Sequence, residues 1–318
     1  MARFSFFSWA RVTLLVFGLA GIVGCAGTPR PIAAQVITPP LAPATPAAAL
    51  SPTPARMVVT SEPTETPVPT STEVATMVEP SPAPFIATGQ HAYLTTVQIA
   101  NDDGSTRTVD VDYLLYLPGN YGQDPQRQWP LILFLHGAGE RGYDPQDITR
   151  YSIPASLTTT LDFPFIVLSP QSPPDDWWSN QVDVLDALLN QIQATYAVDP
   201  RRIYLTGQSM GGFGTWAMAL KYPARFAAIV PVASGYDVTS DVVPANICDL
   251  KDVPIWVFHG ALDESVLPDQ VTAMVQALQD CSGNVRFTLY PDADHLDSSN
   301  RAYADPELYE WLLKQVRP

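Results

Sequence analysis

A strand–turn–helix segment around Ser209 constrains the fold more than any other part of the chain. Residues 203–206 are apolar or β-favouring, residues 207–211 form a Gly-x-Ser-x-Gly motif, and residues 213–220 have a helix-forming composition. A tight turn of this kind strains the serine backbone and lifts the hydroxyl clear of the sheet. Glycines are expected on both sides because the strand and helix backbones crowd the turn. We therefore predict that Ser209 is a nucleophile; the alternative is a glycine-rich connection with an incidental serine.

From residue 90 onward, strand-like and helix-like segments alternate. Turn residues 101–104 separate the first two strands, which predicts an antiparallel hairpin. The later apolar runs are continuous, which is typical of strands buried on both faces of a parallel sheet. We predict an α/β fold, with a mostly parallel twisted sheet, helices on both faces, and ligands at the carboxyl ends of the strands. The predicted strands are 93–100, 109–117, 131–135, 165–168, 203–206, 228–232, 255–258 and 286–290, and the predicted helices are 182–196, 213–220, 268–280 and 306–316.

The first 89 residues are predicted to lie outside the catalytic domain of residues 90–318. Residues 1–24 carry positive charge and then an apolar stretch that is short for a membrane span, and Cys25 follows a small residue. This pattern resembles a bacterial lipoprotein signal, which implies lipid attachment at Cys25 and an extracytoplasmic, membrane-anchored protein. An ordinary cleaved signal or an uncleaved anchor is the alternative. Residues 25–89, rich in proline, threonine and alanine, predict a disordered linker because they cannot bury enough apolar surface to offset chain ordering.

Charge and cysteine content restrict the partners further. A net charge of −15 argues against nucleic-acid binding and against attraction to anionic membrane surfaces. In an exported protein, Cys248 and Cys281 could form a disulfide that contributes about 3–4 kcal/mol; two unpaired thiols are the alternative. The spacing offers no metal-site pattern, and we expect a monomer that needs no cofactor.

Two residues that follow the motif are candidate partners for Ser209. A serine hydroxyl is a weak nucleophile until a base, usually a histidine held by a carboxylate, takes its proton. His295 lies in a predicted loop between the last strand and the last helix, although it could be an ordinary surface histidine. Asp263 follows the strand at 255–258 and is the preferred carboxylate. Asp292 and Asp294 compete with it, but they lie so near His295 that we expect them to shape its loop.

Backbone N–H groups are predicted to stabilise a developing oxyanion. One donor is Met210, which immediately follows the serine. The second comes from the glycine-rich loop 136–142, where we choose Ala138 and keep Gly137 and Gly139 as alternatives. Loss of one such donor typically lowers turnover 10²–10³-fold.

Three motifs together resemble the α/β-hydrolase superfamily: Gly-Gln-Ser-Met-Gly-Gly, His-Gly-Ala-Gly-Glu-Arg-Gly and His-Gly-Ala-Leu-Asp. More narrowly, residues 93–318 resemble secreted bacterial esterases known as predicted peptidases or phospholipase/carboxylesterases, relatives of feruloyl esterases and polyhydroxybutyrate depolymerases. The resemblance implies Ser209 as nucleophile, His295 as base and Asp263 as its carboxylate, with Ala138 and Met210 as oxyanion donors. Many relatives have glycine where this chain has Asp294, an added carboxylate that would shift the pH optimum upward if it contacted the imidazole.

Aromatic residues after the strand at 165–168 are candidates for substrate binding. Trp177 and Trp178 could stack on a sugar or an aromatic acyl group, or could simply cover the core. Gln208, next to the serine, is assigned with them to substrate binding. The short connections show no lid domain, which favours an open cleft and bulky or polymeric esters. The predicted function is an extracytoplasmic serine carboxylesterase; the alternatives are a serine peptidase for short peptides and a non-catalytic binding protein on a hydrolase scaffold.

Overall fold

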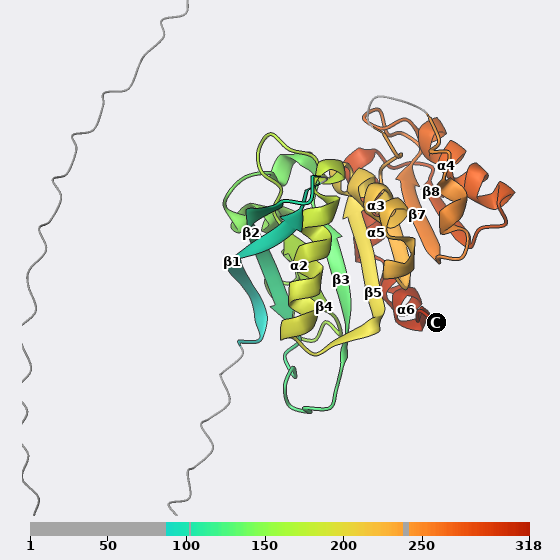
Figure 1. Ribbon diagram of the computed structural model, residues 1–318. Helices are drawn as coiled ribbons and strands as arrows, with labels where there is room; N and C mark the ends of the chain where they lie inside the picture. The colour runs from blue at the N-terminus through green and yellow to red at the C-terminus, as the bar shows by residue number, and fades with distance from the viewer. Residues whose placement is uncertain (1–86, 102, 238–241) are drawn as a thin grey trace, which may run out of the picture. The chain divides into compact units, whose positions relative to one another are not determined.

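The computed structural model describes residues 87–101, 103–237 and 242–318, and these residues build one eight-stranded sheet covered by helices (Figure 1). The predicted signal segment 1–24, Cys25 and nearly all of the linker 25–89 lie outside the described residues. The strands are β1 (Gly89–Ala100), β2 (Thr106–Leu117), β3 (Trp129–Leu135), β4 (Ile166–Pro170), β5 (Val198–Gln208), β6 (Ala228–Val232), β7 (Ile255–Gly260) and β8 (Val285–Tyr290).

The strand order, β1-β2-β4-β3-β5-β6-β7-β8, places the Ser209 segment near the middle of the sheet. β1 and β2 form the predicted antiparallel hairpin, and β2 also runs antiparallel to β4. From β4 to β8 every neighbouring pair is parallel. The carboxyl ends of these six strands therefore meet at one edge, and the loops that follow them can converge on the same site.

Helices cover both faces of the sheet because both faces are apolar. Along β3, Leu131, Leu133 and Leu135 pack into one core, and Ile132 and Phe134 pack into the other. The first core is completed by α2, α3 and α4, and the second by α1, α5 and α6. The helices are α1 (Ser152–Ser156), α2 (Val182–Thr195), α3 (Met210–Lys221), α4 (Pro268–Asp280), α5 (His295–Ala304) and α6 (Pro306–Lys314), with 3₁₀ turns η1 (Ala138–Glu140), η2 (Pro145–Arg150), η3 (Trp178–Asn180), η4 (Pro223–Arg225) and η5 (Ile247–Leu250).

The predicted α/β fold is confirmed, and all eight predicted strands are present. The helix α5 was not predicted. The sequence analysis expected a loop, with His295 in it, between the last strand and the helix predicted at 306–316. α5 carries few apolar residues and buries mainly Ser298, Ser299, Ala302 and Tyr303. Small and hydroxyl-bearing residues give a weak hydrophobic period, so packing against β7 rather than composition decides this helix.

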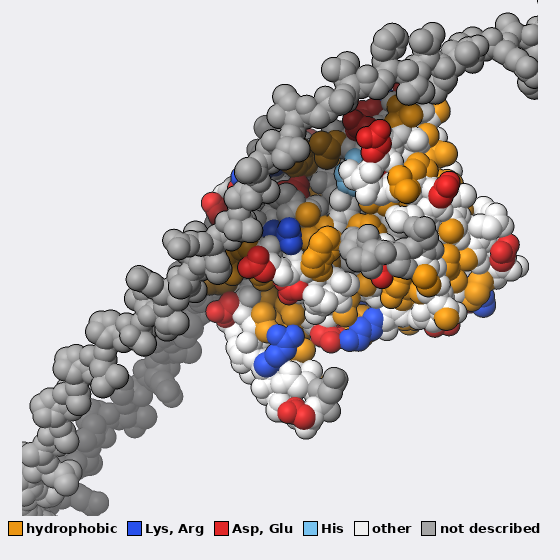
Figure 2. Space-filling view, turned by 90° about the horizontal axis from the view of Figure 1, so that it is seen from above, with side chains coloured by type: hydrophobic (Ala, Val, Ile, Leu, Met, Phe, Trp, Pro, Cys, Tyr) orange, Lys and Arg blue, Asp and Glu red, His pale blue; other side chains and the backbone are white. Residues whose placement is uncertain are grey.

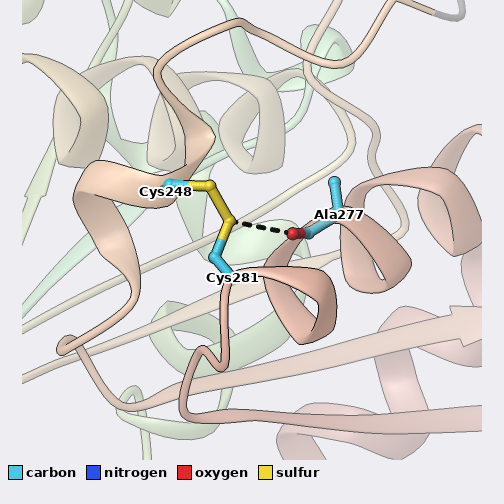
Figure 3. Close-up of a disulfide and its surroundings, with 3 residues drawn as sticks. All are labelled: Cys248, Ala277 and Cys281. Carbon is cyan, nitrogen blue, oxygen red and sulfur yellow. Dashed lines mark hydrogen bonds between the residues drawn. A yellow bond between two sulfur atoms is a disulfide. The ribbon is translucent and has the colours of Figure 1, made fainter.

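The predicted disulfide between Cys248 and Cys281 is present and joins η5 to the end of α4 (Figure 3). The two Cα atoms lie 5.7 Å apart, a normal separation for a disulfide. The Sγ of Cys281 also lies 3.1 Å from the carbonyl oxygen of Ala277, one helical turn earlier (Figure 3). The bond thus ties α4 to the connection between β6 and β7.

No helix in the part of the chain that the structure describes is both long and apolar enough to cross a membrane.

Candidate active site

Ser209 occupies a strained turn between β5 and α3. Its backbone has φ 53° and ψ −119°, a conformation that non-glycine residues rarely adopt. The neighbouring backbones explain the two glycines of the motif. A Cβ atom on Gly207 would lie 2.4 Å from the Gly211 carbonyl oxygen, and one on Gly211 would lie 1.9 Å from the Leu135 carbonyl oxygen. The predicted strand–turn–helix geometry is therefore present.

His295 and Asp263 lie beside Ser209 in a continuous hydrogen-bonded chain. The Ser209 Oγ is 2.9 Å from His295 Nε2, and His295 Nδ1 is 2.7 Å from Asp263 Oδ2. The carboxylate can only accept, so the proton of the neutral imidazole sits on Nδ1, and Nε2 accepts the hydrogen bond from the serine hydroxyl. The structure thus brings together three residues from the ends of β5, β7 and β8.

Asp263 is held as a buried carboxylate. Its Oδ1 accepts hydrogen bonds from the backbone N–H groups of Ser265 and Val266, each at 2.9 Å. Burial alone would favour the neutral acid and is the largest single influence. The hydrogen bonds from His295 and Val266, together with the electrostatic attraction of His295 and His259, outweigh it and hold the pKa of the Asp263 carboxyl below its usual range. Asp263 is therefore charged and pre-oriented toward His295.

A second histidine, which sequence analysis left without a role, also contacts Asp263. His259 is fully buried, and its Nε2 lies 3.0 Å from the Val266 carbonyl oxygen and 3.4 Å from Asp263 Oδ2. A carbonyl can only accept, so this Nε2 carries a proton. Burial lowers the pKa of His259, which keeps the ring neutral. The signal in the sequence was a histidine at the end of the buried strand β7, four residues before the candidate acid.

The Asp294 carboxylate does not act on the His295 ring as the sequence suggested it could. Asp294 is the N-cap of α5, and its Oδ1 accepts a hydrogen bond from the backbone N–H of Asp297 at 2.9 Å. His295 is consequently the first residue of a helix rather than a loop residue. Asp292 pairs with Arg301 at 2.7 Å and is exposed, so it too serves the surroundings of α5. Neither of these competitors replaces Asp263.

The two predicted oxyanion donors begin two different helical turns. Met210 is the first residue of α3, and Ala138 is the first residue of η1. The N–H groups at the start of a helical segment have no partner within it and can serve a ligand. Ala138, Met210 and Ser209 line one cavity. The structure therefore places both backbone positions beside the serine.

His136, another buried histidine, controls the orientation of the Gly137–Ala138 peptide. Its Nε2 accepts a hydrogen bond from the backbone N–H of Ser172 at 3.0 Å, so the proton sits on Nδ1. Nδ1 donates to the Gly137 carbonyl oxygen at 2.6 Å. In a trans peptide the carbonyl and the following N–H point in opposite directions. By holding the Gly137 carbonyl, the His136 ring fixes the direction of the Ala138 N–H.

The surroundings of His136 are buried, which favours neutral groups. Burial lowers the pKa of His136 to about 4 and raises the pKa of the Glu140 carboxyl. The Gln208 amide donates to Glu140 Oε1 at 3.4 Å, and its carbonyl oxygen accepts from the Ser152 hydroxyl. Gln208 is 5% exposed and supports the oxyanion loop from behind. Its predicted role in direct substrate contact was therefore wrong.

The cavity beside Ser209 has a volume of about 430 Å³. Trp177 lines it and is 36% exposed, so its predicted contact with substrate stays a prediction. Trp178 is 1% exposed, and its indole N–H donates to the His136 carbonyl oxygen at 2.9 Å. The prediction that Trp178 contacts substrate was wrong. The structure supports the alternative, in which this tryptophan covers the core. Figure 2 looks onto this end of the sheet and shows hydrophobic side chains across much of the face.

Arg141 connects the two loops that border the cavity. Its Nε donates to the Ala138 carbonyl oxygen at 3.1 Å, and one terminal nitrogen donates to the Asp176 carbonyl oxygen at 3.5 Å. The guanidinium also lies 5.7 Å from the centre of the Trp177 ring. The oxyanion loop and the aromatic wall are therefore joined by one side chain that sequence analysis did not single out.

Across the described ranges, no group of three or more His, Cys, Asp or Glu side chains is arranged to hold a metal ion.

Comparison with known proteins agrees with this architecture. A family model described as the dienelactone hydrolase family matches residues 175–305. A solved structure titled as a thermostable esterase is 28% identical, with a TM-score of 0.55, over 71% of this chain and 72% of that one. The "Bifunctional acetylxylan esterase/xylanase XynS20E" of Neocallimastix patriciarum is 26% identical over 63% of this chain and 28% of that protein. "Probable carboxylesterase SOBER1-like" of Arabidopsis thaliana is 23% identical over 58% of this chain and 79% of that protein.

The sheet, the strained serine turn and the hydrogen-bonded Ser–His–Asp chain define an α/β-hydrolase of the serine-hydrolase type. Within that superfamily, the part of the chain from just after β4 to the end of α5 is similar to the dienelactone hydrolase family.

Proposed function

We propose that this protein is an extracytoplasmic serine carboxylesterase that works through an acyl-enzyme. The observation that carries the proposal is the chain of hydrogen bonds from Ser209 Oγ through His295 to Asp263, with distances of 2.9 and 2.7 Å. These separations lie within the reach that proton transfer between a nucleophile and its base requires.

In the acylation half of the reaction, the Ser209 Oγ forms a bond to the ester carbonyl carbon while its proton moves to His295 Nε2. The negative charge that develops on the carbonyl oxygen is stabilised by the N–H groups of Met210 and Ala138. Asp263 stabilises the imidazolium that forms and keeps its ring oriented. Collapse of the intermediate breaks the bond to the alcohol oxygen, which takes the proton from His295.

In the second half, water replaces the alcohol. His295 Nε2 removes a proton from the water as its oxygen bonds to the acyl carbon. The second tetrahedral intermediate collapses, the bond to Ser209 Oγ breaks, and the serine regains its proton from His295. The carboxylic acid leaves, and no cofactor enters either half.

Esters are the proposed substrates because two of the relatives are named carboxylesterase and acetylxylan esterase. Two large exposed apolar side chains, Trp177 and Leu267, line the cavity, which favours bulky or polymeric esters over a small buried ligand. Large exposed hydrophobic residues in the connections that follow strand ends at this edge are Tyr143, Tyr151, Trp177, Leu262 and Leu267, with Leu296 in the first turn of α5.

The test is ester turnover by the full chain, with Ser209→Ala beside it. We expect turnover of acetyl esters that is lost in the variant, together with a serine adduct after treatment with an organophosphonate. Turnover of a peptide anilide but of no ester would favour the serine peptidase. Ester turnover that survives in Ser209→Ala would refute the assigned nucleophile, and no turnover with any substrate would favour a binding protein.

Export and lipid anchoring through Cys25 belong to the same proposal. The Cys248–Cys281 disulfide supports an oxidising compartment, since disulfides persist mainly outside the cytosol. Labelled fatty acid should be incorporated into the full chain expressed in a bacterium, and the substitution Cys25→Ser should abolish this label. Equal labelling of both proteins would contradict the anchor.

A further inference from the structure

His259, at the end of β7, contacts both ends of the turn that carries the candidate catalytic carboxylate. Its Nε2 donates to the Val266 carbonyl oxygen at 3.0 Å and lies 3.4 Å from Asp263 Oδ2. Within the same turn, Asp263 Oδ1 accepts hydrogen bonds from the backbone N–H groups of Ser265 and Val266. The ring on β7 and the backbone of residues 263–266 therefore hold the carboxylate from two sides.

The backbone just before this turn is tied to the segment that leads into His295. The Ala261 N–H donates to the Tyr290 carbonyl oxygen at 2.9 Å. The Leu262 N–H donates to the Ala293 carbonyl oxygen at 3.0 Å. These two bonds fix the first part of the connection after β7 relative to the catalytic histidine. The hydrogen bond from the buried ring on β7 fixes the later part of the same connection.

Packing alone does not account for a histidine at this position. The His259 side chain is fully buried, and within the described residues its Nδ1 has no hydrogen-bond partner. Burying a polar atom without a partner costs free energy that an aliphatic side chain would avoid. Val257, two residues earlier on the same face of β7, is such an aliphatic core residue. The hydrogen bond from Nε2 is therefore what distinguishes the contribution of His259 from simple packing.

We propose that His259 is a positioning residue, which holds the turn 263–266 so that the Asp263 carboxylate stays within hydrogen-bond distance of His295 Nδ1. The present separation of that carboxylate and that nitrogen is 2.7 Å. Because Asp263 orients the imidazole and stabilises the imidazolium, a carboxylate that shifts away from His295 lowers kcat. The inference rests on the proposed esterase function and adds a residue that acts through Asp263, without contact with the substrate.

Four substitutions in the full chain separate positioning from packing. His259→Leu removes both ring nitrogens, and His259→Asn keeps an amide that is too short to reach Val266. His259→Gln is one methylene longer and can place an N–H near the position of Nε2. Val257→Ala, in the same core, is the control for lost packing.

Three measurements are made on each variant. They are kcat for p-nitrophenyl acetate, the melting temperature, and the downfield proton resonance of His295 Nδ1, which reports the hydrogen bond to Asp263. His259→Leu is also combined with Asp263→Ala, because a double-mutant cycle shows whether the histidine acts through that carboxylate.

We expect His259→Leu and His259→Asn to lower kcat about 10²-fold and to weaken the downfield resonance, and His259→Gln to recover most of both. Val257→Ala should lower the melting temperature and leave kcat and the resonance unchanged. In the Asp263→Ala background, His259→Leu should lower kcat less than about twofold.

A loss of equal size with and without the Asp263 carboxylate would overturn the positioning role while the esterase function stood. Equal kcat in His259→Asn and His259→Gln would overturn it too, even if His259→Leu did not fold. If the wild type hydrolysed no ester, the proposed function would fail. The resonance needs no substrate, so its strength in the wild type and in His259→Asn would still decide whether His259 holds the carboxylate.

Discussion

Two histidine–carboxylate pairs flank Ser209, and they differ in almost every physical respect. His295 and Asp263 are 2.7 Å apart, and the histidine side chain is 18% exposed. His136 and Glu140 are 3.9 Å apart, and both side chains are nearly inaccessible to solvent. The first pair contains a carboxyl with a lowered pKa, whereas the second has a histidine with a lowered pKa and a carboxyl with a raised one.

Hydrogen-bond donors explain the difference. Asp263 receives N–H groups from the backbone and from His295, and these donors, with the electrostatic attraction of His295 and His259, outweigh the cost of burying its charge. Around His136 burial prevails, so the ring stays neutral and acts as a fixed donor and acceptor for the backbone. The same pair of residue types can therefore move a proton in one place and hold a peptide in another.

Of the substitutions that distinguish the two pairs, His295→Ala is expected to have the largest effect on turnover. Without its base, Ser209 should lose turnover by a factor on the order of 10⁴–10⁶, while the fold is retained. Steady-state and single-turnover kinetics with an acetyl ester would measure the loss. Retention of most of the activity would mean that another group, such as His259, takes the proton.

A smaller loss of turnover is expected when the other pair is broken. His136→Phe keeps an aromatic ring against Trp178 but removes the donor to the Gly137 carbonyl, so kcat should fall up to about 10²–10³-fold. KM should change little, because the misplaced donor serves the transition state. His136→Gln, which retains a side-chain N–H, should recover part of the loss. Wild-type kcat in both variants would contradict the positioning role.

The free energy of unfolding should fall at acid pH, because His136 is buried as a neutral ring. Its folded pKa of about 4 lies below the usual 6.5, so the unfolded chain binds this proton first. The stabilising contribution is complete above pH 6.5 and is lost as the pH falls toward 4, by roughly 3 kcal/mol. Urea unfolding at several pH values should show this slope in the wild type and a weaker slope in His136→Phe. Parallel slopes would show that the pKa of His136 is the same in the folded and unfolded states, which would contradict its burial as a neutral ring.

The smallest effect concerns the capping of the helix that begins with His295. Asp294→Ala should destabilise the protein by about 1 kcal/mol, because the Asp297 N–H loses its acceptor. Asp305→Ala, which removes the equivalent cap of α6, should cost about as much. We expect only Asp294→Ala to lower turnover slightly, since α5 carries His295. Equal turnover in the two variants would mean that the cap does not position the catalytic histidine. Thermal unfolding and kcat measure both quantities.

Much of the site was predictable because its signals are local. The glycines at 207 and 211 reflect steric crowding within five residues, and the buried strands are continuous apolar runs. Asp263 follows such a strand directly. By contrast, α5 has little hydrophobic period, and the different fates of Trp177 and Trp178 cannot be read from two adjacent identical residues.

By itself, the sequence determined the α/β fold, the strained turn at Ser209 and the residues able to act as its base and acid, because sterics, periodicity and residue order are properties of the chain. Only the tertiary structure decided that His259 contacts the catalytic carboxylate, that His136 stays neutral under the oxyanion loop, and that Trp177 rather than Trp178 faces the cavity. Those outcomes depend on burial and on partners far away in the sequence. His295 meets a serine 86 residues before it, and Trp178 bonds a backbone 42 residues before it.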